Sequence, residues 1–521
     1  METRCFLIVL TVCALGSLGT LAGLTTDAWA QRPQRPITAP PGQASRQSQG
    51  ESPSATRKST LPADAVTSHT LTLSGQKFDY TARAGTISLS NGRGDKTAEI
   101  FYVAYTRDGA DRAKRPITFA LNGGPGAASA YLDMIAMGPR ILDFGDGRKL
   151  PSAHARTIDN PDSWLDFTDL VFIDPVGTGY SIPTTGEQDA QKNFFGVRPD
   201  LDALSSVIRL LLTKLDRYAS PIYLTGESYG GFRAARLPLS LSQNEGIAVN
   251  GIILLSPILE FSLLRGDDFN PLPWAFRLPS YAAVNFEKRN ALTPQSLKDA
   301  ERFALGDYLA ALIAPAGDSE RNAPVYAAVA KLIGIPLSDI ERWHGRVPTG
   351  VFTKEIHRDE GEVDSRYDGS VAGPDPDPSA STSDRDDPIL AALTAPLTAG
   401  FVLYLRDELQ FKTERRYVLL NDDLSRKWNW GGRGRNSAPG ATSDLGRALA
   451  LDPQLNVMIV GGMTDLVAPY LMNRYVIDHM PTTVTRDRVT IKLYPGGHMM
   501  YLRPGSRASL HADARGLVGI P

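Results

Sequence analysis

The chain contains almost no cysteine, since Cys5 and Cys13 are the only two among its 521 residues. Both lie in an N-terminal apolar stretch that we expect to be removed as a signal peptide. The mature chain would then have neither a disulfide nor a cysteine nucleophile. Cys13 is a poor lipoprotein site, because the branched Val12 stands directly before it where a small residue is wanted.

The chain also lacks a strong excess of either charge. Its formal net charge is −2, with 21% charged and 42% hydrophobic residues. It is therefore not suited to a polyanionic partner, and we expect no nucleic-acid binding. A chain of this length and composition can bury a sizeable core, but its composition gives no oligomeric state.

Residues 1–30 resemble a secretory signal. Arg4 precedes an apolar run over residues 5–24, and Ala28-Trp29-Ala30 offers small residues on both sides of a cleavage site. We predict cleavage after Ala30 and a secreted or periplasmic mature protein. The alternative is a membrane anchor, but three glycines interrupt this run, and we expect no membrane span in the mature chain.

Composition and pattern divide the remaining chain into four parts. Residues 31–65 are rich in Pro, Gln, Ser and Arg and predict a disordered linker. Residues 66–262 and 399–521 alternate short apolar runs with helical patterns, which predicts a mostly parallel α/β sheet flanked by helices. Between them, residues 263–398 carry helical stretches at 296–313 and 324–333 and predict an inserted helical cap.

Several expected elements can be placed by residue. Antiparallel strands are expected at 70–73, 78–82 and 99–105, and Asp200 is expected to cap a helix. The buried strands of the core are predicted at 117–121, 170–173, 222–224, 252–255, 457–460 and 489–493. The acidic residues Asp375, Asp377, Asp384, Asp386 and Asp387 follow no calcium-loop spacing, so we expect a solvated loop and no metal there.

A nucleophile, an acid and a base follow predicted strands in the order Ser, Asp, His. They lie in Gly226-Glu227-Ser228-Tyr229-Gly230, in Gly462-Met463-Thr464-Asp465 and in Gly496-Gly497-His498. This order is that of the α/β-hydrolases, in which a carboxylate orients the imidazole that takes the serine proton. The alternatives are a turn-capping role for Asp465 and a surface-loop position for His498.

Six motifs in register resemble the serine carboxypeptidase family, in a bacterial-type member. They are 122–126 (Asn-Gly-Gly-Pro-Gly), 160–164, 174–181, 226–231, 461–469 and 496–499. The resemblance implies an α/β-hydrolase fold with an inserted cap. It also implies peptide substrates with a free C-terminus, and no metal or organic cofactor.

Carried over by position, the resemblance implies Ser228 as nucleophile, His498 as general base and Asp465 as its orienting partner. Backbone N–H groups of Gly124 and Tyr229 would form an oxyanion hole. Asn122 and Glu227 would bind the substrate carboxylate, which Glu227 can do only if it or the substrate carries a proton. A buried structural carboxyl is the alternative for Glu227.

The chain departs from the family pattern at two places. Ala127 stands where the family usually has Cys, and Met134-Ile-Ala-Met137 lacks the Glu expected before Gly138-Pro139. The acid pair with Glu227 is therefore broken, which puts the family's acidic pH preference in doubt.

The sequence thus predicts a serine-type carboxypeptidase that forms an acyl-enzyme on Ser228. An esterase or acyltransferase on the same triad is the first alternative. A catalytically silent binding protein is the second.

Overall fold

The computed structural model describes residues 61–264, 266, 269–383, 387–431 and 438–519. The predicted signal peptide at 1–30 and residues 31–60 of the predicted linker lie outside this part. So do Asp384 and Asp386.

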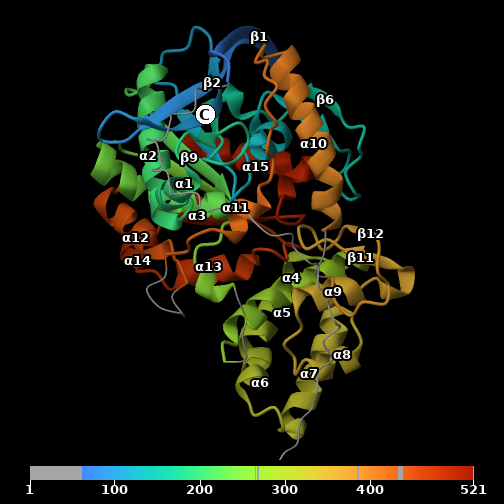
Figure 1. Cartoon of the computed structure of the whole chain (residues 1–521). Coiled ribbons are helices and arrows are strands. Elements are labelled where there is room, and N and C mark those ends of the chain that lie inside the picture. Colours follow the sequence, from blue (N-terminus) through green and yellow to red (C-terminus); the bar gives the residue numbers. More distant parts are fainter. Residues whose placement is uncertain (1–60, 265, 267–268, 384–386, 432–437, 520–521) are drawn as a thin grey trace, which may run out of the picture. The chain divides into compact units, whose positions relative to one another are not determined.

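A 10-stranded sheet forms the centre of the described chain, as Figure 1 shows. Its order is β1-β2-β3-β7-β4-β9-β10-β13-β14, with β8 paired to β3. Pairing is antiparallel from β1 to β7 and parallel from β7 to β14. The strands are β1 Ala65–Leu73, β2 Gln76–Ser90, β3 Lys96–Arg107, β4 Ile117–Leu121, β7 Asp169–Ile173, β8 Ile182–Pro183, β9 Ile222–Glu227, β10 Gly251–Leu255, β13 Asn456–Gly462 and β14 Val489–Tyr494. The predicted mostly parallel α/β fold is confirmed, including every strand named from the sequence.

Side chains of the parallel strands alternate between two hydrophobic clusters, because successive residues of a strand point to opposite faces. In β10, Ile252 and Leu254 join the cluster that also holds α2, α3, α12 and α13, whereas Ile253 and Leu255 join the cluster of η1, α10 and α15. Such strands are buried on both faces, so they appear in the sequence as continuous apolar runs.

The elements that surround the sheet complete the core. The helices are α1 Glu187–Phe194, α2 Val197–Lys214, α3 Tyr229–Ser240, α10 Pro388–Asp407, α11 Asp422–Arg426, α12 Thr442–Leu451, α13 Tyr470–Asp478, α14 Thr482–Thr485 and α15 Pro504–Val518. Short helical turns are η1 Leu132–Met137, η2 Trp164–Asp166, η3 Leu241–Glu245, η4 Phe261–Leu263 and η7 Met500–Leu502. A two-stranded ribbon pairs β5 Arg140–Asp143 with β6 Arg156–Asp159.

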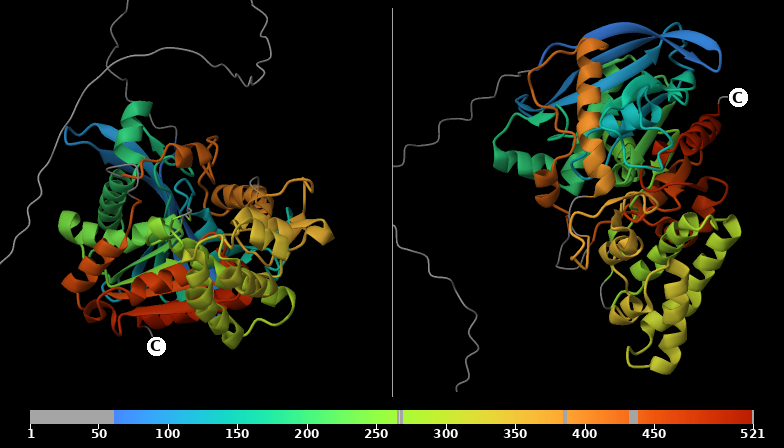
Figure 2. Two further views of the ribbon diagram at one scale, coloured as in Figure 1. Left: turned by 90° about the horizontal axis from the view of Figure 1, so that it is seen from below. Right: turned by 90° about the vertical axis from the view of Figure 1, so that its right-hand side faces the viewer.

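The insertion between β10 and β13 has a hydrophobic cluster of its own, to which Tyr281, Val329 and Phe352 belong. Figure 2 shows its helices together at one end of the described fold. They are α4 Leu272–Lys288, α5 Pro294–Phe303, α6 Leu309–Ile313, α7 Ser319–Ile333, α8 Leu337–Arg342 and α9 Thr349–Glu355, with η5 Ala304–Tyr308, η6 Arg358–Glu360 and the ribbon of β11 Glu362–Asp364 and β12 Ala372–Pro374. Leu466 of the core belongs to the same cluster, so the insertion is packed beside Asp465.

Two sequence expectations about acidic residues are wrong. Asp200 does not cap α2, which begins at Val197 after Gly196; its buried carboxylate instead pairs with Arg233. The acidic segment is not simply solvated, because Asp375 pairs with the buried Lys354 and Asp387 accepts N–H groups at the start of α10. Local pattern could not identify Arg233 or Lys354, since tertiary packing brings both of them in, whereas Asp387 is a local N-cap of α10.

Within the described residues, α10 is the one helix that is long and apolar enough to cross a membrane, by length and composition alone. One side of it is buried in the core through Leu393, Leu397 and Phe401. Figure 2 shows the helix running along the side of the core.

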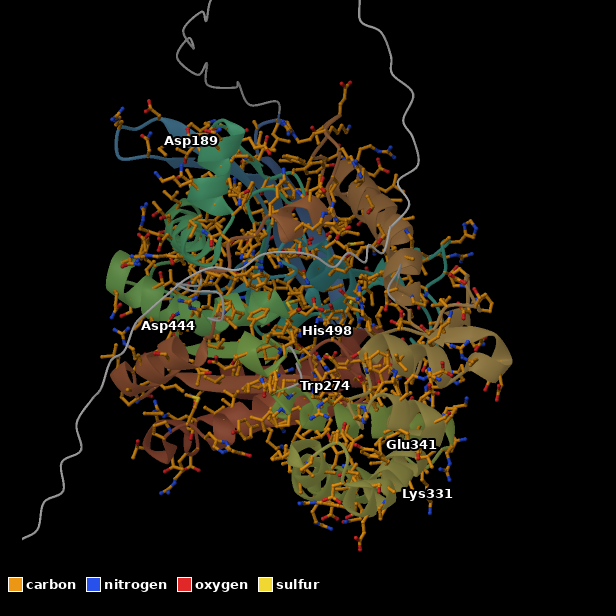
Figure 3. All side chains as sticks on the ribbon, turned by 60° about the horizontal axis from the view of Figure 1, so that its bottom comes forward. Asp189, Trp274, Lys331, Glu341, Asp444 and His498 are labelled. Carbon is orange, nitrogen blue, oxygen red and sulfur yellow. The ribbon has the colours of Figure 1, made fainter. Side chains whose placement is uncertain are left out.

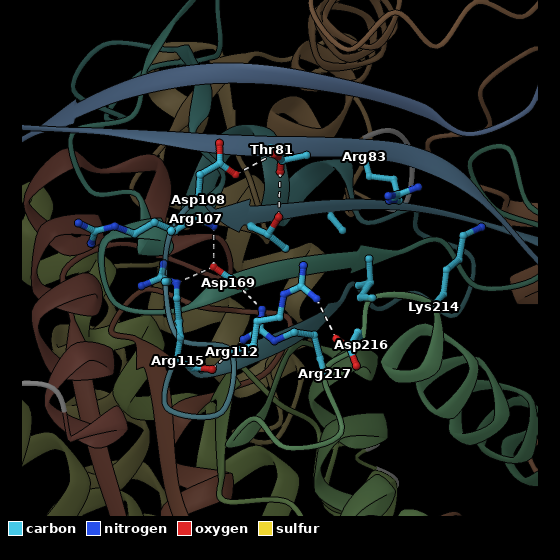
Figure 4. Close-up of a pocket in the computed structure, with 15 residues that line it drawn as sticks. Thr81, Arg83, Arg107, Asp108, Arg112, Arg115, Asp169, Lys214, Asp216 and Arg217 are labelled. Atoms are coloured by element: carbon cyan, nitrogen blue, oxygen red, sulfur yellow. Dashed lines mark hydrogen bonds and ion pairs between the residues drawn. The ribbon is translucent and has the colours of Figure 1, made fainter.

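Buried ion pairs lie at the start of β7, beside the segment that precedes β4 (Figure 4). Asp169 at the start of β7 accepts Nε of Arg115 at 2.6 Å, the backbone N–H of Arg107 at 2.9 Å and Nη1 of Arg217. The cavity of about 360 Å³ beside them is lined mainly by polar and charged side chains. Of its other cations, Arg83, Arg112 and Lys214 already pair with carboxylates, and Arg107 lies over the ring of Phe78.

Candidate active site

Ser228 occupies the tight turn between β9 and α3. Its φ of 59° and ψ of −122° are rare for a residue with a side chain, and they are typical of a nucleophile elbow. The flanking glycines are required by space. A Cβ on Gly226 would lie 2.1 Å from the carbonyl oxygen of Gly230, and a Cβ on Gly230 would lie 2.1 Å from that of Leu121.

Asp465 follows β13 and His498 follows β14, at the same edge of the sheet as Ser228. Nδ1 of His498 lies 2.9 Å from Oδ2 of Asp465. Oδ1 of Asp465 accepts the N–H groups of Val467 at 2.8 Å and Ala468 at 2.9 Å, which fixes the carboxylate. Both side chains are buried, and Figure 3 labels His498 near the middle of the view.

The insertion helps to hold His498. The backbone N–H of His498 donates to the carbonyl of Tyr367, in the loop between β11 and β12, and the two rings meet edge to face at 5.4 Å. A Cβ on Gly497 would lie 1.9 Å from that carbonyl oxygen, so only glycine fits there. Sequence reasoning missed Tyr367, because nothing in its local pattern indicates a long-range contact.

Charges around His498 favour its protonated form. Burial alone would lower the pKa of His498, but Asp465 and Glu227 outweigh it, and the pKa is raised above its usual value. Nε2 of His498 lies 4.0 Å from Oε1 of Glu227. No hydrogen bond joins Ser228 Oγ to His498 within the described chain; such contacts are often long before substrate binds.

Glu227 and Asn122 form a buried pair beside the serine. Nδ2 of Asn122 donates to Oε2 of Glu227, while Oδ1 of Asn122 accepts the N–H of Leu132 at 3.1 Å. Burial raises the pKa of Glu227, although His498, Tyr501 and Asn122 act in the opposite direction. The carboxyl group therefore keeps a proton to higher pH than an exposed glutamate does.

The backbone around Gly124 and Tyr229 comes close to the serine. A Cβ on Gly123 would lie 2.7 Å from the Tyr229 nitrogen and 2.9 Å from Cβ of Ser228. Tyr229 is the first residue of α3, where helix N–H groups have no intrahelical acceptor. Gly124 has a φ of 98°, which favours glycine. A side chain at position 123 would therefore collide with the backbone around the nucleophile.

A buried ion pair between Arg233 and Asp200 supports the backbone around the nucleophile. Nη1 of Arg233 on α3 donates to the carbonyl of Asn122 at 2.7 Å, and Nε of Arg233 lies 2.7 Å from Asp200 on α2. The guanidinium also stacks 4.8 Å from the centre of the Tyr229 ring. One side chain therefore links the end of β4 to the helix that follows the nucleophile.

Ser228, His498 and Glu227 line a cavity of about 130 Å³. Its charged side chains are those of Glu227 and His498, and most of the other lining residues are apolar, aromatic or glycine. The lining is Asn122, Gly123, Gly124, Ala127, Tyr131, Glu227, Ser228, Ile258, Tyr367, Leu390, Leu420, Val467, His498 and Met499. Tyr131 and Leu390 were not identified from the sequence, because apolar and aromatic residues look the same in a core and in a binding site.

Within the described residues, the hydrogen-bond partners of Glu227 include no second carboxyl group. The nearest in sequence to the expected position is Asp133, which is buried and accepts the hydroxyl of Tyr105 at 3.1 Å. The hydroxyl of Tyr501 lies beside Glu227 instead.

Comparison with known proteins gives a family likeness over part of the chain. The model of the family described as serine carboxypeptidase matches residues 75–253, which include Asn122, Glu227 and Ser228 but neither Asp465 nor His498. A carboxypeptidase Y homolog of Arthroderma benhamiae is 31% identical over 153 residues, covering 28% of this chain and 27% of the relative. The pheromone-processing carboxypeptidase KEX1 of Saccharomyces cerevisiae is 31% identical over 142 residues, covering 26% and 18%.

The chain thus spans about a quarter of the length of the curated relatives it matches. Among solved structures, VinJ matches with a TM-score of 0.36 and 13% identity, covering 83% of this chain and 98% of that one. Proline iminopeptidase of Mycobacterium smegmatis matches with a TM-score of 0.35 and 14% identity, covering 83% and 99%.

Proposed function

We propose that this protein is a serine-type carboxypeptidase that releases C-terminal amino acids from peptides. The observation that carries the proposal is the Asn122–Glu227 pair beside Ser228 and His498. An amide and a carboxyl with a raised pKa can together accept a substrate carboxylate that shares one proton with Glu227. The match of residues 75–253 to the serine carboxypeptidase model supports the same activity.

The reaction follows from the roles of three side chains. His498 takes the proton of Ser228 Oγ as that oxygen attacks the last peptide carbonyl, and Asp465 stabilises the imidazolium that forms. The N–H groups of Gly124 and Tyr229 donate to the oxyanion. His498 then gives its proton to the leaving amine, and a water molecule activated by His498 hydrolyses the acyl-enzyme.

The cellular location of the protein and its branch of the family are also part of what we propose. We assign the protein to a bacterial-type branch of the family, secreted or periplasmic after cleavage following Ala30. The N-terminal signal pattern supports this location.

Matched peptides test the activity. Purified protein is incubated with N-blocked dipeptides that carry either a free or an amidated C-terminus, and the released amino acids are identified. We expect release from the free peptides and none from Ser228→Ala protein. Turnover of esters alone would instead indicate an esterase or acyltransferase, and failure of a fluorophosphonate to label Ser228 would indicate a silent binding protein.

A further inference from the structure

Tyr131 and Tyr367 line the same cavity as Glu227, and the hydroxyl of Tyr501 lies beside its carboxyl group. Tyr131 stands at the start of η1, Tyr367 lies in the loop of the insertion, and Tyr501 belongs to η7 just after His498. Glu227 contributes to raising the pKa of all three, and Tyr131 and Tyr367 contribute to that of Tyr501. Three separate segments of the chain therefore place neutral donors around one carboxyl group.

Two of these hydroxyls are buried without a well-aligned hydrogen bond in the described chain, namely those of Tyr131 and Tyr501. Tyr131 is 4% exposed and Tyr501 is fully buried. Buried polar groups nearly always have a partner, so an orphaned hydroxyl needs an explanation. Tyr501 has a nearby acceptor, because its hydroxyl lies beside the Glu227 carboxylate. Tyr131 makes no such contact within the described residues, and its side chain lines the active-site cavity.

The cavity contains no lysine or arginine among its lining residues. A peptide carboxylate bound there would need hydrogen-bond donors from neutral groups. Asn122 directs one of the two Nδ2 hydrogens to Glu227, and its oxygen accepts from Leu132, so one amide hydrogen is left for a ligand. The hydroxyl of Tyr131 is a further neutral donor in the lining, and it has no hydrogen-bond partner within the described residues. Burial raises the pKa of Tyr131 far above neutrality, so this donor keeps its proton under assay conditions.

We propose that Tyr131 is a substrate-binding residue that donates its hydroxyl hydrogen to the terminal carboxylate of the peptide, with Tyr501 as the positioning residue of Glu227. This inference rests on the proposed function and deepens it. It assigns the terminal carboxylate to a neutral tyrosine donor beside Glu227, in a chain that lacks the second acid.

The binding test separates this proposal from the reaction itself. Binding of an N-blocked dipeptide, free or amidated, is measured by calorimetry on Ser228→Ala protein. We expect the free peptide to bind more tightly. Adding Tyr131→Phe should weaken the binding of the free peptide about tenfold or more, which is the range for a hydrogen bond to a charged group. The affinity for the amidated peptide should not change.

Tyr404→Phe is the matched control. Its hydroxyl is also buried without a well-aligned hydrogen bond in the described chain, but it lies beside the hydroxyls of Tyr80 and Tyr105, belongs to α10 and is outside the cavity lining. It should leave both affinities unchanged. Equal binding of free and amidated peptides, or a Tyr131→Phe effect on both alike, overturns the Tyr131 role. If Tyr131→Phe acts as expected and the protein with Ser228 intact hydrolyses no peptide, the binding site stands and the proposed function fails.

The role of Tyr501 is read from a pH profile. Removing a donor from the ionised form of Glu227 raises its pKa. Tyr501→Phe should therefore move the alkaline fall of kcat/KM on free-carboxylate peptides to higher pH, with the ester profile unmoved. A uniform loss at every pH, without a shift, would show that Tyr501 only packs.

Discussion

Nδ1 of His498 lies 2.9 Å from Oδ2 of Asp465, while Oδ1 of the same carboxylate holds two backbone N–H groups. The two carboxylate oxygen atoms of Asp465 thus have different hydrogen-bond partners. One is committed to the turn after β13, and the other faces the imidazole. The pair therefore fixes which ring nitrogen of His498 carries the proton.

Asp465→Asn should abolish most activity while leaving the turn intact. Oδ1 of the new amide can keep accepting from Val467 and Ala468, so its NH2 group must face Nδ1 of His498. That ring nitrogen then becomes an acceptor, and Nε2 carries the proton and cannot take one from Ser228. We expect kcat to fall about 10³- to 10⁴-fold, as for comparable triads, at a nearly unchanged melting temperature. Retention of wild-type kcat would rule out Asp465 as the orienting carboxylate.

Gly123→Ala should close the proposed oxyanion site. The added methyl group would lie 2.7 Å from both the Tyr229 nitrogen and the Glu227 carbonyl oxygen. We expect kcat to fall about a hundredfold or more, the usual effect of losing one oxyanion donor. Gly92→Ala is the control, since that position has open space around it. Similar kinetics for both variants would refute the assignment.

Arg233→Ala should destabilise the fold strongly. Arg233 and Asp200 are 1% and 5% exposed, so the change leaves a buried carboxylate without its cation. We expect a loss of about 3–5 kcal/mol in the free energy of unfolding, measured by denaturant titration.

Arg236→Ala is the comparison on the same helix. Arg236 pairs with Asp444 where both side chains are partly exposed, at 21% and 24%. Its loss should cost about 1 kcal/mol or less. Equal effects of the two changes would mean that burial does not decide the contribution of Arg233.

The exported protein should begin at Gln31. Cleavage after Ala30 would remove Cys5 and Cys13, so the mature chain should not react with thiol reagents even when denatured. Intact-mass measurement and N-terminal sequencing of protein from the culture fluid or periplasm check this. Either cysteine in the exported form would contradict the predicted cleavage.

Much of the central sheet could be predicted from the sequence, because buried parallel strands appear as short apolar runs. The run at 252–255 is apolar throughout, and that at 117–121 is apolar apart from Thr118, since both faces of the sheet are covered. The glycines around Ser228 fit an elbow too tight for side chains. The side chains that surround the candidate active site could be predicted less well. Tyr367 and Tyr501 reach Glu227 from separate segments, and a tyrosine in such a segment has no pattern that separates packing from binding.

The same limit explains the error at Asp200. An aspartate before an apolar helical pattern resembles an N-cap. Its actual partner, Arg233, lies 33 residues away on another helix. Helix-capping rules consider only hydrogen-bond partners that are close in sequence. They give no information on a buried cation that the fold brings from another helix.

Glu227→Gln should separate carboxylate binding from acyl transfer. Burial raises the pKa of Glu227, so its protonated form, which can share a proton with a substrate carboxylate, is present below that pKa and lost above it. With wild-type protein, kcat/KM for free-carboxylate peptides should fall as pH rises through this pKa, whereas small esters should show only the acid limb set by His498. The variant cannot titrate, so its profiles on the two substrates should become parallel, with ester turnover nearly intact. If Glu227→Gln keeps the wild-type alkaline fall on free peptides, another group controls it, and the peptidase proposal loses its main support over an esterase.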